Sequence, residues 1–190
     1  MKQKILIVQP IHERGVRVFD ERFDVRVASD PSVATVLKEI RGVAGVVVRT
    51  APFPGEIIEA ADALKVIGRH GVGVDNIDVK AATEKGIVVV YTPNANATSV
   101  AEHTITAIGA LAKRAVSYDR ATREGRWEIR NSYKAVDLDG KILGLVGIGR
   151  IGSMVARRAA AAYNMKVIAF DPYIRPETAD RMGVSLLPRM

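Results

Sequence analysis

Residues Leu143 to Gly152 read LGLVGIGRIG, and this pattern predicts the fold of the chain around it. Its glycines follow the pattern G-x-G-x-x-G. The residues before them, 142–146, form an apolar run of strand length, and residues 151–163 after them repeat apolar side chains at helical spacing. A second apolar run, residues 166–170, follows that helix. Strand, glycine turn, helix and strand in this order predict a βαβ unit with parallel strands.

Each part of this pattern has a physical role in holding a dinucleotide. Gly147 permits a tight turn, Gly149 lets the backbone approach a pyrophosphate, and Gly152 lets the helix pack closely on the strand. Unpaired N–H groups at the start of the helix attract the phosphates. Asp171 lies about twenty residues after Gly152, at the position where an acidic side chain binds the ribose hydroxyls. A carboxylate there repels a 2′-phosphate, so the sequence favours NAD over NADP, although Arg175 leaves NADP open.

The first half of the chain alternates short strands with helices. We expect strands at residues 5–8, 25–28, 43–48, 64–68 and 87–90. Helices are expected between them, at residues 15–23, 32–40, 54–61 and 77–85, with Pro54 in a first turn and Gly86 as a C-terminal cap. Strands joined by crossover helices predict an α/β fold with a doubly wound parallel sheet that closes near residue 91.

A polar, turn-rich stretch, residues 92–98, separates the two halves and is interpreted as a hinge. Ser99 and Glu102 then fit a capping box, which predicts that a helix begins at Ser99. That helix is expected to continue to about Arg123. Residues 125–139 are expected to be irregular, and residues 184–187 are predicted to form another strand.

The composition argues against several classes of function. The chain has 190 residues and a formal net charge of +7. It has no cysteine, and this excludes disulfides and thiolate metal sites. No metal site is predicted. Its basic residues are scattered and not interleaved with aromatics, so nucleic acid is not an expected partner. The first apolar run is too short for a signal peptide and no run is long enough to span a membrane, so we expect a cytoplasmic protein.

Four stretches occur in an order that is typical of one enzyme family. They are Val46-Val47-Val48-Arg49-Thr50, then Arg69-His70-Gly71-Val72-Gly73-Val74-Asp75-Asn76-Ile77-Asp78, then Thr92-Pro93-Asn94 running into Ser99-Val100-Ala101-Glu102, and finally the glycine pattern with Asp171-Pro172. With them the chain resembles the D-isomer-specific 2-hydroxyacid dehydrogenase family, which includes phosphoglycerate, hydroxypyruvate/glyoxylate and D-lactate dehydrogenases.

The resemblance implies an NAD-dependent oxidoreductase that transfers a hydride between a 2-hydroxy or 2-keto acid and NAD. It implies a flavodoxin-like substrate domain at residues 1–91 and a hinge, long helix and irregular connection at residues 92–140. Residues 141–190 would form the first half of a Rossmann NAD-binding domain. Glyoxylate, hydroxypyruvate and 3-phosphoglycerate all remain open as substrates.

The resemblance also implies residue roles. Backbone N–H groups of Val72 and Gly73 would bind the substrate carboxylate, with Val72 also bordering the nicotinamide. Arg49 would pair with a carboxylate or a phosphate. The remaining cofactor contacts are Val100, in the first turn of the long helix, and Arg150 and Ile151 at the pyrophosphate, beside Gly147, Gly149, Gly152 and Asp171.

Other polar residues are given structural roles. Asp75, Asn76 and Asp78 are interpreted as turn and helix-cap residues. Neither His70 nor His103 is assigned as an acid–base group, and His12 is interpreted as a loop residue.

No catalytic residue is assigned in this chain. The family's histidine, glutamate and arginine that act on the substrate would lie after Met190, so we expect the 190-residue chain to be inactive alone. The strand at 142–146 is expected to have an apolar edge that is disordered, covered by another chain or domain-swapped, and a homodimer is expected. An NAD(H)-binding regulatory or partner-pairing half-protein without catalysis is the alternative, and another Rossmann family is a third.

Overall fold

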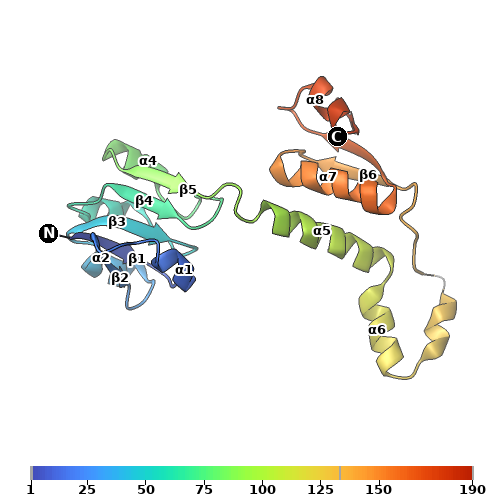
Figure 1. The fold of residues 1–190 in the computed structure, drawn as a ribbon, viewed down its shortest axis with the longest axis horizontal. Coiled ribbons are helices and arrows are strands. Elements are labelled where there is room, and N and C mark those ends of the chain that lie inside the picture. The colour runs from blue at the N-terminus through green and yellow to red at the C-terminus, as the bar shows by residue number, and fades with distance from the viewer. Residues whose placement is uncertain (1, 133, 190) are drawn as a thin grey trace. The chain divides into compact units, whose positions relative to one another are not determined.

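A computed structural model describes residues 2–132 and 134–189 (Figure 1). The chain divides into two compact units, the first ending at Ala95 and the second beginning at Asn96. Both units are built from parallel strands and helices, so the predicted α/β class is confirmed. Among the described residues, no helix combines the length and the apolar character needed to cross a bilayer.

The first unit contains one sheet of five parallel strands. The strands are β1 (Gln3–Ile7), β2 (Phe23–Val27), β3 (Val43–Val48), β4 (Val66–Arg69) and β5 (Val88–Tyr91). Their order in the sheet is β2-β1-β3-β4-β5, which is the flavodoxin-like order predicted above. The chain moves from β1 outward to β2 and from β3 outward to β4. The gap between the carboxyl ends of β1 and β3 is therefore the topological switch point, where ligands of such sheets bind.

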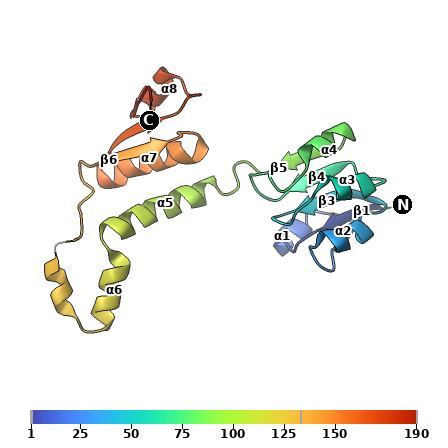
Figure 2. The ribbon, with the colours of Figure 1, turned by 180° about the vertical axis from the view of Figure 1, so that it is seen from behind.

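Three of the four helices of this unit bury apolar side chains against the sheet. The helices are α1 (Glu13–Val16), α2 (Val33–Glu39), α3 (Gly55–Ala60) and α4 (Val79–Glu84). One core cluster joins residues of α2, α3 and α4 to the strands, including Val36, Ile57 and Ala82, whereas α1 buries none of its residues. Right-handed crossovers explain why these three helices share one face, which can be followed in Figure 2.

Two predicted helix positions are wrong. The expected helix at 15–23 stops at Val16, because Asp20 accepts the backbone N–H of Arg22 in a turn and Phe23 already pairs with Gln3 in β2. Pro54 is the N-cap of α3 and lies before its first turn. Gly86 does follow α4 with a φ of 67°, as its predicted cap role requires.

The second unit contains three parallel strands in the order β6-β7-β8. They are β6 (Ile142–Val146), β7 (Lys166–Phe170) and β8 (Val184–Leu186), joined by α7 (Arg150–Tyr163) and by α8 (Pro176–Arg181), a helix that was not predicted. This is the first half of a Rossmann fold, as predicted. Among the described residues β6 pairs only with β7, and the side chains of Ile142 and Val146 are 62% and 76% exposed.

The long helix of the prediction is two helices. α5 (Ala97–Ala112) and α6 (Ala115–Arg123) are separated at Arg114, whose φ of 53° and ψ of 35° lie in the left-handed region. A short 3-10 helix, η1 (Trp127–Ser132), follows. The predicted capping box is also wrong: α5 begins at Ala97 after Asn96, so Ser99 already lies within the helix and caps nothing.

Candidate functional site

Arg49 lies at the switch point of the first unit, directly after β3. Parallel pairing brings the end of β1 beside it, because Ile7 pairs with Val47 and the N–H of Val8 donates to the Val47 carbonyl at 2.9 Å. The Arg49 side chain is exposed, and its Nη1 donates to the Pro10 carbonyl at 2.9 Å. A guanidinium has five N–H donors, so most of them remain available to an anion.

The backbone after Arg49 is held by side chains from both neighbouring strands. From the end of β1, Gln9 Oε1 accepts the N–H groups of Thr50 and Ala51 at 2.8 and 2.7 Å. From the loop after β4, Asn76 Nδ2 donates to the carbonyls of Arg49 and Ala51 at 3.3 and 2.7 Å. The sequence predicted no role for Gln9, and for Asn76 it predicted a turn or helix-cap role.

The loop after β4 presents free backbone donors. The N–H groups of Val72 and Gly73 donate to no atom of the described residues, and both residues are exposed. Gly71 precedes them with a φ of 154°, and the guanidinium of Arg69 occupies the space that a Cβ on Gly71 would need. Thr92 fixes this turn, since its N–H and Oγ1 both donate to the Gly71 carbonyl, at 2.9 and 3.1 Å.

Two further polar residues of the first unit cap helices. Asp78 Oδ1 accepts the N–H of Ala81 at 2.9 Å at the start of α4, which confirms its predicted cap role. His12 Nδ1 accepts the N–H of Arg14 at 3.2 Å and so caps α1, where only a loop role was expected. Neither contact points to acid–base chemistry.

The glycine turn of the second unit has three glycines with different environments. Gly147 has a φ of 87°, which favours glycine, and its N–H donates to the Phe170 carbonyl at 2.8 Å. A Cβ on Gly152 would overlap the Gly147 carbonyl oxygen. Gly149 has a φ of −65°, and a Cβ built on it would meet nothing within 4 Å.

The start of α7 offers unpaired donors beside Gly149. The N–H groups of Gly149, Arg150 and Ile151 donate to no atom of the described residues, and the first paired amide is that of Ser153, which donates to Gly149 at 3.0 Å. Arg150 and Ile151 are both exposed. These amides and the dipole of a 14-residue helix form an environment that favours an anion.

Asp171 is tied to the same turn. Its Oδ2 accepts the N–H of Ile148 and its Oδ1 accepts the N–H of Tyr173, each at 2.9 Å. The backbone N–H of Ile148, followed by that of Tyr173, holds the pKa of the Asp171 carboxyl below its ordinary value. The group is therefore an ionised acceptor at neutral pH, and each oxygen keeps a lone pair for a further donor.

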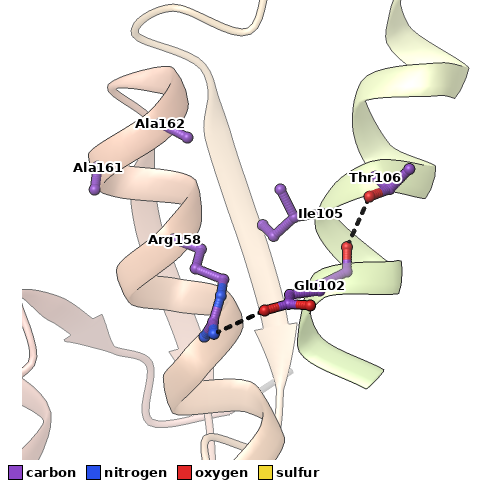
Figure 3. A pocket seen from close by; sticks show the side chains of 6 residues that line it. All are labelled: Glu102, Ile105, Thr106, Arg158, Ala161 and Ala162. Carbon is purple, nitrogen blue, oxygen red and sulfur yellow. Dashed lines mark hydrogen bonds and ion pairs between the residues drawn. The ribbon is translucent and has the colours of Figure 1, made fainter. Parts of the chain in front are cut away.

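Val100 lies on α5, and a hollow lies between α5 and α7. Val100 is partly exposed, and its carbonyl accepts the Thr104 hydroxyl at 2.8 Å. The hollow has a volume of about 560 Å³, and Arg158 of α7 lies 3.8 Å from Glu102 of α5 at its border. Ile105 points toward α7 (Figure 3). The residues that line it are Glu102, Ile105, Thr106, Arg158, Ala161 and Ala162. None belongs to the glycine turn, so this hollow is a gap between two packed helices and is separate from that turn.

No metal site accompanies these groups. Within residues 2–132 and 134–189, no three His, Asp or Glu side chains are arranged to hold an ion.

Comparison with known proteins gives a consistent result. A sequence model of the D-isomer specific 2-hydroxyacid dehydrogenase catalytic domain matches residues 5–184. D-3-phosphoglycerate dehydrogenase of Methanocaldococcus jannaschii is 44% identical over 97% of this chain, and D-3-phosphoglycerate dehydrogenase 2, chloroplastic, of Arabidopsis thaliana is 39% identical over 98% of it. The alignments cover 35% and 30% of those proteins, so the chain spans about a third of their length.

Solved structures agree. D-lactate dehydrogenase from Aquifex aeolicus, complexed with NAD and lactic acid, matches 98% of this chain and 56% of its own with a TM-score of 0.82 and 25% identity. NAD-dependent formate dehydrogenase from Staphylococcus aureus, in complex with NAD, matches 97% of this chain and 60% of its own with a TM-score of 0.83 and 26% identity. The chain therefore belongs to the D-isomer-specific 2-hydroxyacid dehydrogenase family.

Proposed function

We propose that this chain supplies the substrate-anion site and the first half of the NAD site of an NAD-dependent 2-hydroxyacid dehydrogenase. Residues 1–91 are the proposed substrate domain, residues 92–140 the hinge, long helix and connection, and residues 141–190 the NAD-binding part. Support comes from the family match and from two relatives whose structures hold NAD. When bound, the nicotinamide ring supplies the hydride acceptor or donor.

The observation that carries the proposal is the environment of Gly149. Gly147 needs its positive φ and Gly152 needs its missing Cβ, so the fold alone explains both residues. Gly149 has an ordinary φ and open space, so the fold does not require glycine there. A ligand that lies directly against the backbone of Gly149 would require glycine at this position, because a Cβ would keep it away. A pyrophosphate at the start of α7 is such a ligand.

The neighbouring groups fit the rest of a dinucleotide. The free amides of Arg150 and Ile151 would donate to the pyrophosphate, and Asp171 would accept the ribose hydroxyls. A 2′-phosphate would meet the ionised Asp171 carboxylate, which supports NAD over NADP. Val100 is proposed to contact the cofactor from the first turn of α5.

Arg49 and the loop at Val72 and Gly73 are the proposed substrate-binding groups. The two free amides suit a carboxylate, and the guanidinium suits a second anionic group. The relatives named D-3-phosphoglycerate dehydrogenase, 44% and 39% identical, support 3-phosphoglycerate as the substrate, with its phosphate at Arg49. No residue of this chain is assigned as the base, so we expect no turnover by the 190-residue chain alone.

Replacing Gly149 by alanine tests the cofactor proposal. A Cβ at this position would enter the pyrophosphate space, so NADH affinity should fall by at least about tenfold, while an alanine at this N-cap costs less than about 1 kcal/mol of stability. Gly144→Ala in β6 is the matched control, because a Cβ there meets only Ile168 at 4.0 Å. Equal NADH affinity in the Gly149→Ala and Gly144→Ala variants would contradict the proposal.

The free edge of β6 favours the second candidate, a half-protein that pairs with a partner chain. Ile142 and Val146 are exposed on this strand, which has one neighbour among the described residues. The chain can be mixed with the part of a family member that it does not cover, about two thirds of that protein. NADH binding without turnover in this mixture would support the second function, and turnover would support the dehydrogenase.

A further inference from the structure

Gln9 makes an unusual set of contacts for a residue at the end of a strand. It follows β1, and its side chain contacts the segment that follows β3, the strand beside β1 in the sheet. The carboxamide oxygen accepts two successive N–H groups, those of Thr50 at 2.8 Å and Ala51 at 2.7 Å. The carboxamide nitrogen donates to the Thr50 hydroxyl at 3.2 Å.

These contacts fix the backbone immediately after Arg49. The oxygen of one amide group satisfies two N–H donors that no strand partner satisfies, because β3 ends at Val48. Ala51 is buried, so its N–H would otherwise lack a partner away from water. The Gln9 side chain thus connects the end of β1 to backbone groups that lie 41 and 42 residues further along the chain.

The guanidinium of Arg49 is anchored to the same loop. Its Nη1 donates to the carbonyl of Pro10, the residue directly after Gln9. Asn76 holds the opposite side of the segment through the carbonyls of Arg49 and Ala51. Arginine has several rotatable bonds and loses rotamer entropy when a ligand fixes it, so an anchor formed before binding reduces that loss.

We propose that Gln9 is a positioning residue for the anion site, holding Arg49 in the place where it meets the charged group of the substrate. The inference rests on the proposed role of Arg49 and extends it to the end of β1. Gln9 acts through the backbone of Thr50 and Ala51 and need not touch the substrate.

The test measures anion affinity at Arg49 in the 190-residue chain. The probe is 3-phosphoglycerate, and the readout is the Nε–H resonance of Arg49 in nitrogen-15 NMR spectra during titration. Gln9→Met removes the acceptor at nearly constant length, whereas Gln9→Glu keeps an acceptor for both amides. Gln3→Met is the matched control, because Gln3 is an exposed glutamine at the other end of β1.

We expect Gln9→Met to raise the dissociation constant by roughly tenfold and to move the Thr50 and Ala51 amide resonances upfield. Gln9→Glu should keep those two amide resonances near their original positions, and Gln3→Met should change neither quantity. A merely structural glutamine would lower the melting temperature but leave the dissociation constant within about twofold, and that outcome overturns the proposal.

The unmodified chain separates this inference from the proposed function. If its Arg49 resonance shows no saturable change with 3-phosphoglycerate, then the anion-binding role of Arg49 is wrong and the role of Gln9 is wrong with it. If the unmodified chain binds and the Gln9→Met variant binds equally well, only the role of Gln9 is wrong.

Discussion

At the scale of single residues, three glycines of one turn are glycine for three different reasons. Gly147 needs a left-handed φ, Gly152 needs the absence of a Cβ, and Gly149 needs neither. The fold thus explains glycine at positions 147 and 152, whereas a bound ligand would explain glycine at position 149. This difference also allows the stability and the binding function of the turn to be changed independently.

Gly152→Ala should destabilise the second unit. The added Cβ would overlap the Gly147 carbonyl oxygen, which is backbone and can move only if α7 shifts away from β6. We expect a loss of about 1–3 kcal/mol in the free energy of unfolding, measured by urea denaturation. Gly144→Ala is again the control, and an equal stability of the two variants would contradict the close packing of α7.

Asp171→Asn should weaken NADH binding, relax the preference against NADPH and change how stability depends on pH. The amide nitrogen of asparagine cannot accept, so the N–H of Ile148 or of Tyr173 loses its partner. The folded-state pKa of Asp171 is lowered, so its stabilisation is present above the unfolded-state pKa and is lost as the pH falls through the folded-state value. Urea titrations at several pH values should show the two proteins converging in acid, and a constant difference would contradict this origin.

The sequence is informative about residues whose roles are local. The glycine turn and Asp171 lie within one βαβ unit, and their spacing alone predicted where the structure places them. Gln9 could not be found in this way, because its partners lie 41 and 42 residues away and no motif connects them. The ligand-binding roles of all the predicted site residues stay predictions, since each concerns a bound ligand.

At the scale of elements, strands were easier to predict than helix ends. The strands at residues 43–48, 142–146 and 166–170 have the predicted bounds, because long apolar runs determine them. The capping box at Ser99 and Glu102 matched a real pattern, yet α5 begins two residues earlier. The helix starts earlier because the Asn96 carbonyl accepts the N–H of Val100 at 2.9 Å, which makes Asn96 the N-cap in place of Ser99.

Arg114→Gly should stabilise the junction of α5 and α6. Arg114 has a left-handed backbone conformation, which costs an L-residue roughly 1–2 kcal/mol and glycine much less. After the entropy loss of glycine, we expect a gain of about 0.5–1 kcal/mol in the free energy of unfolding. Arg120→Gly, inside α6, should instead cost about 1 kcal/mol. A destabilised Arg114→Gly variant would mean that the arginine side chain outweighs the backbone strain.

At the scale of the whole molecule, the alternation of strands and helices was enough to predict both sheets. Crossover handedness leaves few topologies for five short parallel strands, and the observed order is one of them. The break at Arg114 was not predictable, because no glycine or proline marks it and the apolar residues on both sides continue.

We expect the chain to form a homodimer through the junction of α5 and α6. Leu111 and Val116 are 78% and 79% exposed there and border a hollow of about 440 Å³. Leu111→Asp should raise the dimer dissociation constant at least about tenfold in analytical ultracentrifugation. Val18→Asp is the control, since Val18 is equally exposed (77%) but lies in the first unit. A monomeric unmodified chain, or a Leu111→Asp variant that dimerises normally, would contradict this interface.

The most direct test of the account is a fluorescence titration of NADH with the unmodified 190-residue chain, repeated with NADPH. We expect saturable NADH binding and at least about tenfold weaker NADPH binding, because the Asp171 carboxylate would repel the added phosphate. Equal binding of both cofactors would contradict the role of Asp171. The absence of any saturable NADH binding would contradict the proposal that the turn from Gly147 to Gly152 holds the pyrophosphate.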